Sequence, residues 1–309
     1  MTVNLPHFVA VGEALTDLVR TTGNRWISKV GGSSWNVARA VAAQGVDSAF
    51  AGAISCCWFG DALWRASKAA ALDLRFLQRV DRSPLLAVVV QSRPPQYFFV
   101  GDDSADLYFD ARALPSGWEE AVAWVHFGGI SLAREPLAQR LVALATELHT
   151  LGVAISYDPN VRNVMDEQYQ ATFERMCRLA SVIKVSDDDL IGLMRAVDPL
   201  QALQQVRARN PQAWWLYTEG AQGAQLLTPA GHWQARPPSI AAVDTIGAGD
   251  ASIAALVAGR IQAPESAPET HLAGAVAAGT AACLTAGASP PTQEVVRVIL
   301  DGVSVTRAS

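Results

Sequence analysis

The sequence predicts an α/β fold built on a doubly wound, mostly parallel sheet. Two observations carry this prediction. Short, apolar, β-rich runs alternate with amphipathic segments along much of the chain, and strands that alternate with helices imply parallel βαβ units. Half of the 309 residues are hydrophobic and only 17% are charged, which provides for a large buried core and argues against disorder.

The expected strands are short runs of apolar residues, and stretches of helical period lie between them. The strands are expected, in chain order, at 8–11, 48–54, 124–127, 154–157, 182–185 and 214–218. Helices are expected at 35–44, 135–149, 167–179 and 200–209. Ser33 or Ser34 is suited to cap the first of these helices with its hydroxyl group.

One segment interrupts the alternation of strands and helices. The runs 85–91 and 96–100 are both β-rich, and the Ser-Arg-Pro-Pro sequence between them favours a turn. The pattern therefore predicts a hairpin. Such a hairpin is either a lid that projects from the main sheet or an ordinary hairpin at the sheet edge.

The C-terminal part of the chain is rich in small residues. The stretches 246–259 and 272–284 consist largely of Ala, Gly and other small side chains, and a short loop at 264–268 separates them. Helices of this composition pack closely and let the backbone approach a ligand. No internal repeat or low-complexity linker divides the sequence, so a single domain over residues 1–309 is expected.

Charge and composition narrow the function classes. The net charge is −5 and no run of Lys and Arg occurs, so nucleic acid is a poor candidate partner. No apolar run reaches the roughly 18 residues of a membrane span, and no signal peptide is indicated. The histidines show no metal-ligand spacing, and no C-x-x-C pair occurs among the four cysteines, Cys56, Cys57, Cys177 and Cys283. Reduced thiols in a cytoplasmic protein are expected.

The strongest chemical signal is the sequence Ala-Val-Asp-Thr-Ile-Gly-Ala-Gly-Asp at 242–250. A glycine-rich turn runs directly into an apolar helix, so the N–H groups of Gly247, Ala248 and Gly249 would form an anion site at the helix start. Asp250 would accept a proton from a hydroxyl group while those N–H groups hold a phosphoryl group in transfer. The plainer alternative is that Asp250 only caps the helix.

This motif resembles the C-terminal signature of the ribokinase family, the PfkB-type carbohydrate kinases. Other segments resemble the family in the same order along the chain. They are Val11-Gly12-Glu13 with Asp17, Gly31-Gly32 with Asn36, Asp158–Arg162, Lys184–Asp189, Thr218–Gly223 and Gly287-Ala288. The segment at 158–162 and the run at 126–132 are most similar to fructokinase-like members.

The resemblance implies a three-layer α/β/α core with a small β lid built from segments near 13–30 and 85–110. It also implies transfer of the γ-phosphate of ATP to a primary hydroxyl group, with Asp250 as the base and the amides of residues 247–249 as the anion hole. The residues it places at the sugar are Asp17, Gly31, Gly32 and Asn36. Tyr97 and Arg162 are further candidates for contact with the substrate. Those it places at the nucleotide are Lys184, Ser186, Thr218, Gly220, Gly223 and Gly287.

Metal ions and assembly also follow from the resemblance. ATP would bind with Mg²⁺, and Asp189 would contact the ion through water. The carbonyl groups near Asp244 and Thr245 resemble the family's monovalent-cation loop, which suggests K⁺. Family members often form homodimers through the lid, so a homodimer is an open expectation.

The sequence departs from the family pattern at three places. Ser186 and Asp189 replace the Asn and Glu of the wider family, so weaker metal binding is expected. An acidic residue is usual at the position of Cys57, and fructokinases usually carry small residues and proline where Ser33-Ser34-Trp35 stands. Trp35 is bulky and is expected either to line the sugar pocket or to support the helix from the core. An aromatic face covers a sugar or base well, and we expect the pocket position for Trp35.

The substrate is expected to be a neutral, fructose-like sugar. A 2-keto-3-deoxygluconate kinase would need cations for the substrate carboxylate, for which Arg93 and Arg162 are candidates, but Asp102 and Asp103 would repel it. A nucleoside that stacks on a tryptophan is a third option. A catalytically silent sugar-binding protein on the same fold is the alternative from another class. No G-x-G-x-x-G follows the first strand, so a dehydrogenase lacks support.

Overall fold

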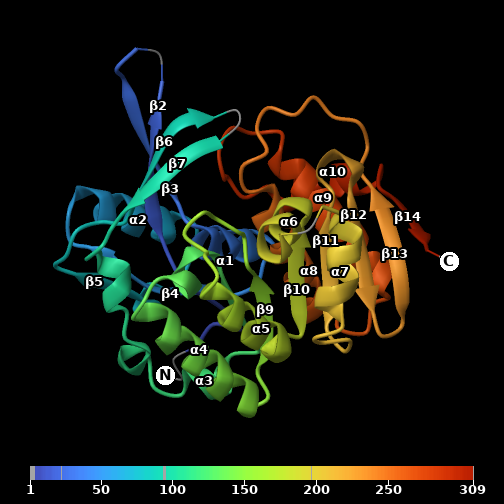
Figure 1. Cartoon of the computed structure of the whole chain (residues 1–309), viewed down its shortest axis with the longest axis horizontal. Helices are drawn as coiled ribbons and strands as arrows, with labels where there is room; N and C mark the ends of the chain where they lie inside the picture. Colours follow the sequence, from blue (N-terminus) through green and yellow to red (C-terminus); the bar gives the residue numbers. More distant parts are fainter. Residues whose placement is uncertain (1–3, 22, 93–94, 196, 309) are drawn as a thin grey trace.

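The computed structural model describes residues 4–21, 23–92, 95–195 and 197–308, with the side chains of 91–97 left out. Within these ranges, ten strands form one large sheet in the order β14-β13-β12-β11-β10-β9-β8-β1-β4-β5 (Figure 1). The strands are β1 Phe8–Val11, β4 Ser48–Ser55, β5 Leu77–Val80, β8 Trp124–Gly128, β9 Ala154–Asp158, β10 Val182–Ser186, β11 Trp214–Thr218, β12 Ala224–Thr228, β13 Gly231–Arg236 and β14 Ser304–Arg307.

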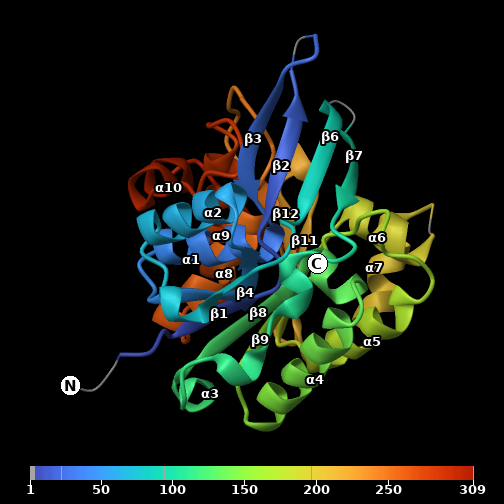
Figure 2. The same cartoon turned by 90° about the vertical axis from the view of Figure 1, so that its left-hand side faces the viewer.

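Helices cover both faces of this sheet, which gives three layers (Figure 2). One face carries α1 Ser33–Ala43, α2 Trp58–Ala69, α8 Ala248–Gln262, α9 Pro268–Ala282 and α10 Gln293–Leu300. The other face carries α3 Trp118–Ala121, α4 Leu137–Thr150, α5 Tyr169–Leu179, α6 Asp187–Met194 and α7 Pro199–Arg207. No helix in the described ranges has both the length and the apolar character needed to cross a membrane.

The sheet confirms the predicted α/β class. Every predicted strand is present, and β11, β10, β9, β8, β1, β4 and β5 run parallel to their neighbours. The antiparallel strands β12, β13 and β14 extend one edge beyond the predicted set. The strands β13 and β14 escaped prediction because they are partly exposed, so their apolar pattern is interrupted.

A second sheet stands away from the main body and has the order β3-β2-β6-β7 (Figures 1 and 2). Its strands are β2 Leu15–Arg20, β3 Trp26–Gly31, β6 Leu86–Ser92 and β7 Pro95–Val100. The antiparallel pairing of β6 with β7 confirms the predicted hairpin. The parallel pairing of β2 with β6 joins it to a second hairpin, so the segment is not a simple edge hairpin.

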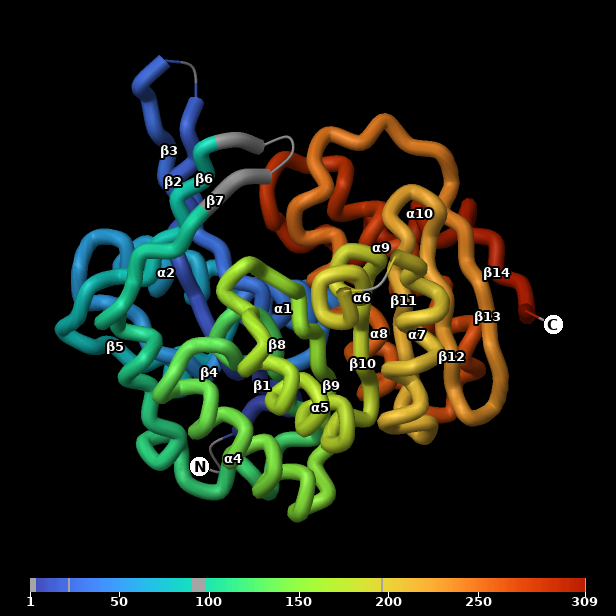
Figure 3. Tube along the Cα trace, viewed as in Figure 1, coloured from blue at the N-terminus to red at the C-terminus, as the bar shows by residue number. Residues whose placement is uncertain are grey.

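The helices α1 and α8 lie side by side although they are far apart in the sequence (Figure 3). Small residues allow α8 and α9 to pack closely, as expected for this composition. A Cβ atom on Gly279 would lie 2.2 Å from the hydroxyl oxygen of Ser252, so a larger residue there would collide with α8. This packing fixes the start of α8 against the rest of the core.

The predicted pocket position of Trp35 is wrong. Its side chain is fully buried, its Nε1 donates to Oγ of Ser67 at 2.9 Å, and the Arg39 guanidinium lies 4.2 Å from its ring centre. Successive helix residues point about 100° apart, so Trp35 faces α2 while Ser33 and Asn36 on the same helix face α8. Trp35 is therefore a core residue.

Replacing Trp35 by Ala is expected to lower the free energy of unfolding by about 3–5 kcal/mol, as for other large-to-small changes in a core. Chemical denaturation measures this loss. Trp58→Ala is the matched control, because Trp58 is 63% exposed and should cost much less stability. A Trp35→Ala protein of normal stability would contradict the core position.

Candidate active site

Several polar residues of the predicted site and its motifs lie where strands of the main sheet end. Asp158, Ser186 and Thr218 are the last residues of the neighbouring strands β9, β10 and β11. Parallel strands share one carboxyl edge, and ligands of open α/β sheets bind in the crevice outside that edge. The start of α8 faces the same region, because Gly249 lies against Lys184 of β10.

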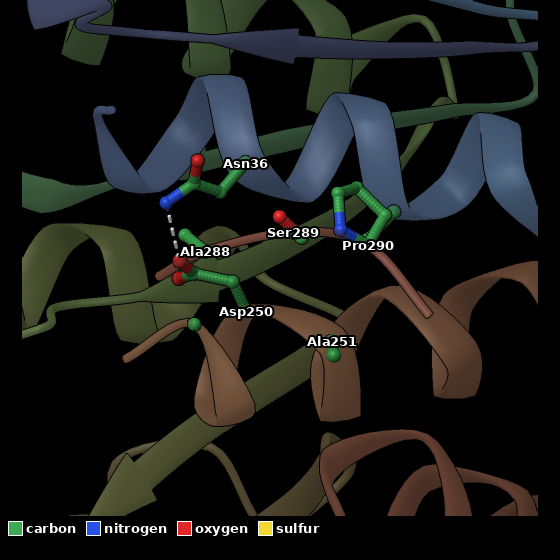
Figure 4. Close-up of a pocket in the computed structure, with 8 residues that line it drawn as sticks. Asn36, Asp250, Ala251, Ala288, Ser289 and Pro290 are labelled. Carbon is green, nitrogen blue, oxygen red and sulfur yellow. Dashed lines mark hydrogen bonds between the residues drawn. The ribbon is translucent and has the colours of Figure 1, made fainter. Parts of the chain in front are cut away.

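Asp250 lies in the first turn of α8 and is 9% exposed. Its Oδ1 accepts a hydrogen bond from the Ser33 hydroxyl at 3.0 Å, and its Oδ2 accepts one from the Asn36 side-chain amide at 2.9 Å. Figure 4 shows Asn36 and Asp250 facing each other at a pocket that Ala288, Ser289 and Pro290 also line. Burial raises the pKa of Asp250, and the two donors partly offset this effect.

The glycine-rich turn has the expected shape. Gly247 caps α8 with a φ of 82°, a conformation that glycine adopts without strain, and a Cβ atom there would lie 2.9 Å from Ala288. The Ala248 N–H donates to the carbonyl of Thr245 at 3.2 Å, so this one of the three predicted donors already has a partner within the turn. The anion-hole role of residues 247–249 stays a prediction.

Lys184 brings positive charge to this turn. Its ammonium lies 3.2 Å from each oxygen of Asp158 and 3.3 Å from Oδ2 of Asp189, and all three side chains are buried. A Cβ atom on Gly249 would lie 3.3 Å from the same nitrogen. Burial raises the pKa of Asp158 to about 7 although Lys184 lowers it. Burial opposes the charge of Lys184, yet the two carboxylates raise its pKa overall.

Ser186 and Asp189 form a capping box at the start of α6. The Oδ2 of Asp189 accepts from the backbone and hydroxyl of Ser186, each at 2.8 Å, and its Oδ1 accepts from the Val161 N–H at 2.7 Å. Burial opposes ionisation of Asp189, but Lys184 and these donors hold its pKa below the usual range. The box accounts for both residues structurally, and their contacts with Mg²⁺ and the nucleotide stay predictions.

Asp17 lies on β2 of the smaller sheet, opposite Lys29. A Cβ atom on Gly31 would lie 2.5 Å from Oδ2 of Asp17, and one on Gly32 would lie 2.5 Å from the Glu13 carbonyl, so the glycine pair lets these segments approach. Burial raises the pKa of Asp17 to about 6, although Lys29 and Arg162 lower it.

Arg162 connects the predicted sugar residues electrostatically. Its charge lowers the pKa of both Asp17 and Asp250, although burial raises the pKa of each carboxyl group by more. Its Nη1 also donates to the carbonyls of Asn160 and Val161 at 3.2 and 2.7 Å. Tyr97 belongs to β7, but its side chain lies outside the described part of the structure.

Three further residues predicted for the nucleotide lie at and after the end of β11. Thr218 ends β11, and Gly220 and Gly223 follow it with φ values of 54° and 103°. A Cβ atom on Gly223 would lie 2.0 Å from the Ala235 carbonyl oxygen, so only glycine fits.

The cation loop is closed by Asp244. Its Oδ1 accepts from the Ile246 N–H at 3.2 Å and its Oδ2 from the Gly287 N–H at 2.9 Å, while Thr245 is exposed. The described residues contain no group of three or more His, Cys, Asp or Glu side chains placed to hold a metal ion. The cation role of Asp244 and Thr245 stays a prediction.

Sequence reasoning missed two residues of the site. Ser33 or Ser34 was expected to cap α1, but Gly32 occupies the cap position and no side chain caps the helix. Glu13 is 2% exposed, and its carboxylate accepts hydrogen bonds from the N–H groups of Ser33 and Ser131, both at 3.2 Å, and from the Ser131 hydroxyl. Burial raises its pKa to about 7. A charged residue directly after a buried strand was the available signal.

Comparisons with known proteins agree with this geometry. A family model described as pfkB family carbohydrate kinase matches residues 6–295. A fructokinase of Klebsiella pneumoniae is 31% identical over 257 residues, which cover 81% of this chain and 82% of that protein.

Two solved structures are similar over almost their whole length. Aminoimidazole riboside kinase from Salmonella enterica, complexed with aminoimidazole riboside and an ATP analog, has 26% identity and a TM-score of 0.82, with 95% of this chain and 99% of that chain covered. Fructokinase from Vibrio cholerae O395, in a form that binds fructose, ADP and calcium ion, has 25% identity and a TM-score of 0.82, with 95% and 98% covered. The family match contains every segment from the first strand to the turn before α8, and the chain belongs to the PfkB family of carbohydrate kinases.

Proposed function

We propose that the protein transfers the γ-phosphate of ATP to a primary hydroxyl group of a neutral, fructose-like sugar, with Asp250 as the general base. The observation that carries this proposal is the placement of Asp250. Its buried carboxylate lies in the first turn of α8, next to Gly249, which lies against the Lys184 ammonium. Phosphoryl transfer depends mainly on positioning and on neutralisation of charge, and both are supplied here.

The chain's own groups divide the work of the reaction. Asp250 accepts the proton of the sugar hydroxyl as the hydroxyl oxygen attacks phosphorus. Burial raises the pKa of Asp250, and a carboxylate with a raised pKa is a stronger base. The free N–H groups of the glycine turn and the positive end of the α8 dipole hold the transferring group. Lys184 adds positive charge next to Gly249.

Mg²⁺ is proposed to accompany ATP, and it would reduce the negative charge of the phosphates. The described residues hold no cluster of three acidic ligands, which fits an ion held mainly by phosphates and water, with Asp189 contacting it through water. K⁺ is proposed at the loop of Asp244 and Thr245. Both Asp244 oxygens already accept N–H groups, so backbone carbonyls would bind this ion.

The smaller sheet is proposed to act as a lid over the sugar, since Asp17 lies on its β2 strand. It is also the proposed surface of a homodimer in the cytoplasm. Large apolar side chains stand exposed on three of its strands, and a second copy would bury them. They are Trp26 and Ile27 on β3, Val90 on β6, and Phe98 and Val100 on β7.

A fructose-like substrate is supported by the fructokinase relatives. The aminoimidazole riboside kinase structure makes a riboside the second candidate. A carboxylated sugar is disfavoured, because Asp102 and Asp103 follow β7 and would repel it. Asp103 also lies 3.7 Å from Arg82, and this exposed ion pair weakens its share of the repulsion. Asp17 and Asp250 near Arg162 add to the repulsion.

Replacing Asp250 by Asn should lower kcat by at least about 100-fold, because the proton acceptor is lost while the shape is kept. Steady-state kinetics measure kcat, and a fluorescent ATP analogue measures nucleotide binding, which should persist. Asp301→Asn, an exposed carboxylate at the end of α10, is the control and should keep full activity. Near-normal turnover by Asp250→Asn would remove the base assignment.

Gly249→Val should abolish turnover while the protein stays folded. The first carbon of the new side chain would lie 3.3 Å from the Lys184 nitrogen, and its methyl groups would crowd the turn where phosphate is expected. Gly274→Val in α9 is the control, because no atom lies within 4 Å of its Cβ position. Turnover and thermal unfolding are measured together, and a fully active Gly249→Val protein would exclude phosphate binding at this turn.

Fructose should give the highest kcat/KM in a coupled assay over fructose, aminoimidazole riboside, ribose, adenosine and 2-keto-3-deoxygluconate. The kcat/KM of fructose should exceed that of another compound by at least about tenfold where that compound leaves buried polar groups of the protein without a hydrogen-bond partner. A higher value for aminoimidazole riboside would replace the sugar assignment. Sugar binding without ATP turnover for any compound would favour the silent binding protein.

A further inference from the structure

Ser33 links the start of α1 to the carboxylate at the start of α8. It is the first residue of α1 and is 8% exposed. Its hydroxyl donates to Oδ1 of Asp250 at 3.0 Å, and its N–H donates to Oε1 of Glu13 at 3.2 Å. The residue therefore holds one oxygen of Asp250 while its own backbone is held by a second carboxylate.

The local backbone explains why the Ser33 hydroxyl is available for this contact. Gly32 occupies the cap position of α1 with a φ of 115°, and no side chain caps the helix. A serine at the cap position would have turned its hydroxyl back to the helix N–H groups. One position later, the hydroxyl points across to α8 instead.

Glu13 makes the position of Ser33 firm. Its other oxygen is bound by Ser131, and a Cβ atom on Gly129 would lie only 2.2 Å from the Glu13 carboxylate. Gly129 thus lets the turn after β8 close over Glu13, so that three hydrogen bonds hold a fully enclosed carboxylate. A buried acceptor with these bonds has little freedom to release Ser33.

Several groups besides Ser33 face Asp250, and they do not act alike. Asn36 of α1 donates to the other oxygen, and Lys184 of β10 and Arg162 of the loop after β9 are the nearby cations. Asp158 of β9 is the nearby anion. Asn36 and Ser33 are the two groups that bond directly to the carboxylate, one to each oxygen.

We propose that Ser33 is a positioning residue for the reaction: its hydroxyl holds the ionised carboxylate of Asp250 in the orientation that accepts the proton of the sugar hydroxyl. This inference rests on the proposed role of Asp250 as the base. A carboxylate oxygen can accept more than one hydrogen bond, so Oδ1 can bind Ser33 and still face the substrate. Because the bond favours the ionised form, its loss should make the base harder to ionise.

The test is the pH profile of kcat/KM for Ser33→Ala. The acid limb of this profile reports the pKa of the base. It is expected to move to higher pH by about one unit, because losing one hydrogen bond to a charged group changes the pKa of that group by about this amount. At pH values below the pKa of the base, kcat/KM of Ser33→Ala should be about tenfold lower than that of the unmodified protein. At pH values well above this pKa, the difference should largely disappear. Ser33→Cys keeps the volume with a weaker donor, so its limb should move the same way by a smaller amount.

Ser34→Ala is the matched control. Ser34 is fully buried on the same turn, and its hydroxyl donates to the Gly128 carbonyl at 3.3 Å rather than to Asp250. Its acid limb should stay in place. The inference is overturned if the acid limb of Ser33→Ala does not move, or if Ser34→Ala moves the limb as far.

Asp250→Asn, measured over the same pH range, separates this inference from the proposed function. Activity that survives in Asp250→Asn would remove the base, and the role of Ser33 with it. An inactive Asp250→Asn protein together with an unmoved acid limb in Ser33→Ala would remove only the role of Ser33. Thermal unfolding of each variant shows whether a loss of rate reflects a loss of folded protein.

Discussion

A buried ammonium group between carboxylates is the interaction on which the rest of the site depends. Lys184 lies among Asp158 and Asp189, with Asp250 close enough to influence it. Placing one of these charges alone in the core would cost several kcal/mol. The elements that carry the charged residues must therefore bring the ammonium and the carboxylates into contact. The ends of β9 and β10 and the start of α6 are therefore held together by charge as well as by apolar packing.

This charge cluster also explains the sequence of the turn before α8. The Lys184 ammonium lies so close to Gly249 that a side chain there would compete for its space. Gly247 must adopt a left-handed conformation against Ala288, which an L side chain rarely does. The glycines thus serve two structural demands, and the open backbone that they leave is the surface on which a phosphoryl group can be held.

Much of the fold and part of the site could be predicted from the sequence because they depend on local pattern. Buried parallel strands read as apolar runs, and the glycine turn before Asp250 is a short continuous motif. Trp35 and Ser33 could not be placed, because a shift of one residue at the start of α1 rotates its side chains by about 100°, and Gly32 sets that start. The bond from Ser33 to Asp250 joins residues 217 positions apart, which no local pattern encodes.

The charge near Arg162 bears on the choice of sugar. Asp17 has a pKa of about 6, raised by burial, so it is mainly ionised at neutral pH. With Asp250 it places two carboxylates near one guanidinium, whose Nη1 is also engaged by backbone carbonyls. A sugar carboxylate would add a third negative charge for the same cation, and close repulsion of this kind amounts to a few kcal/mol near a protein surface. The hydroxyl groups of a neutral sugar can instead donate hydrogen bonds to carboxylates, and this balance favours a neutral substrate.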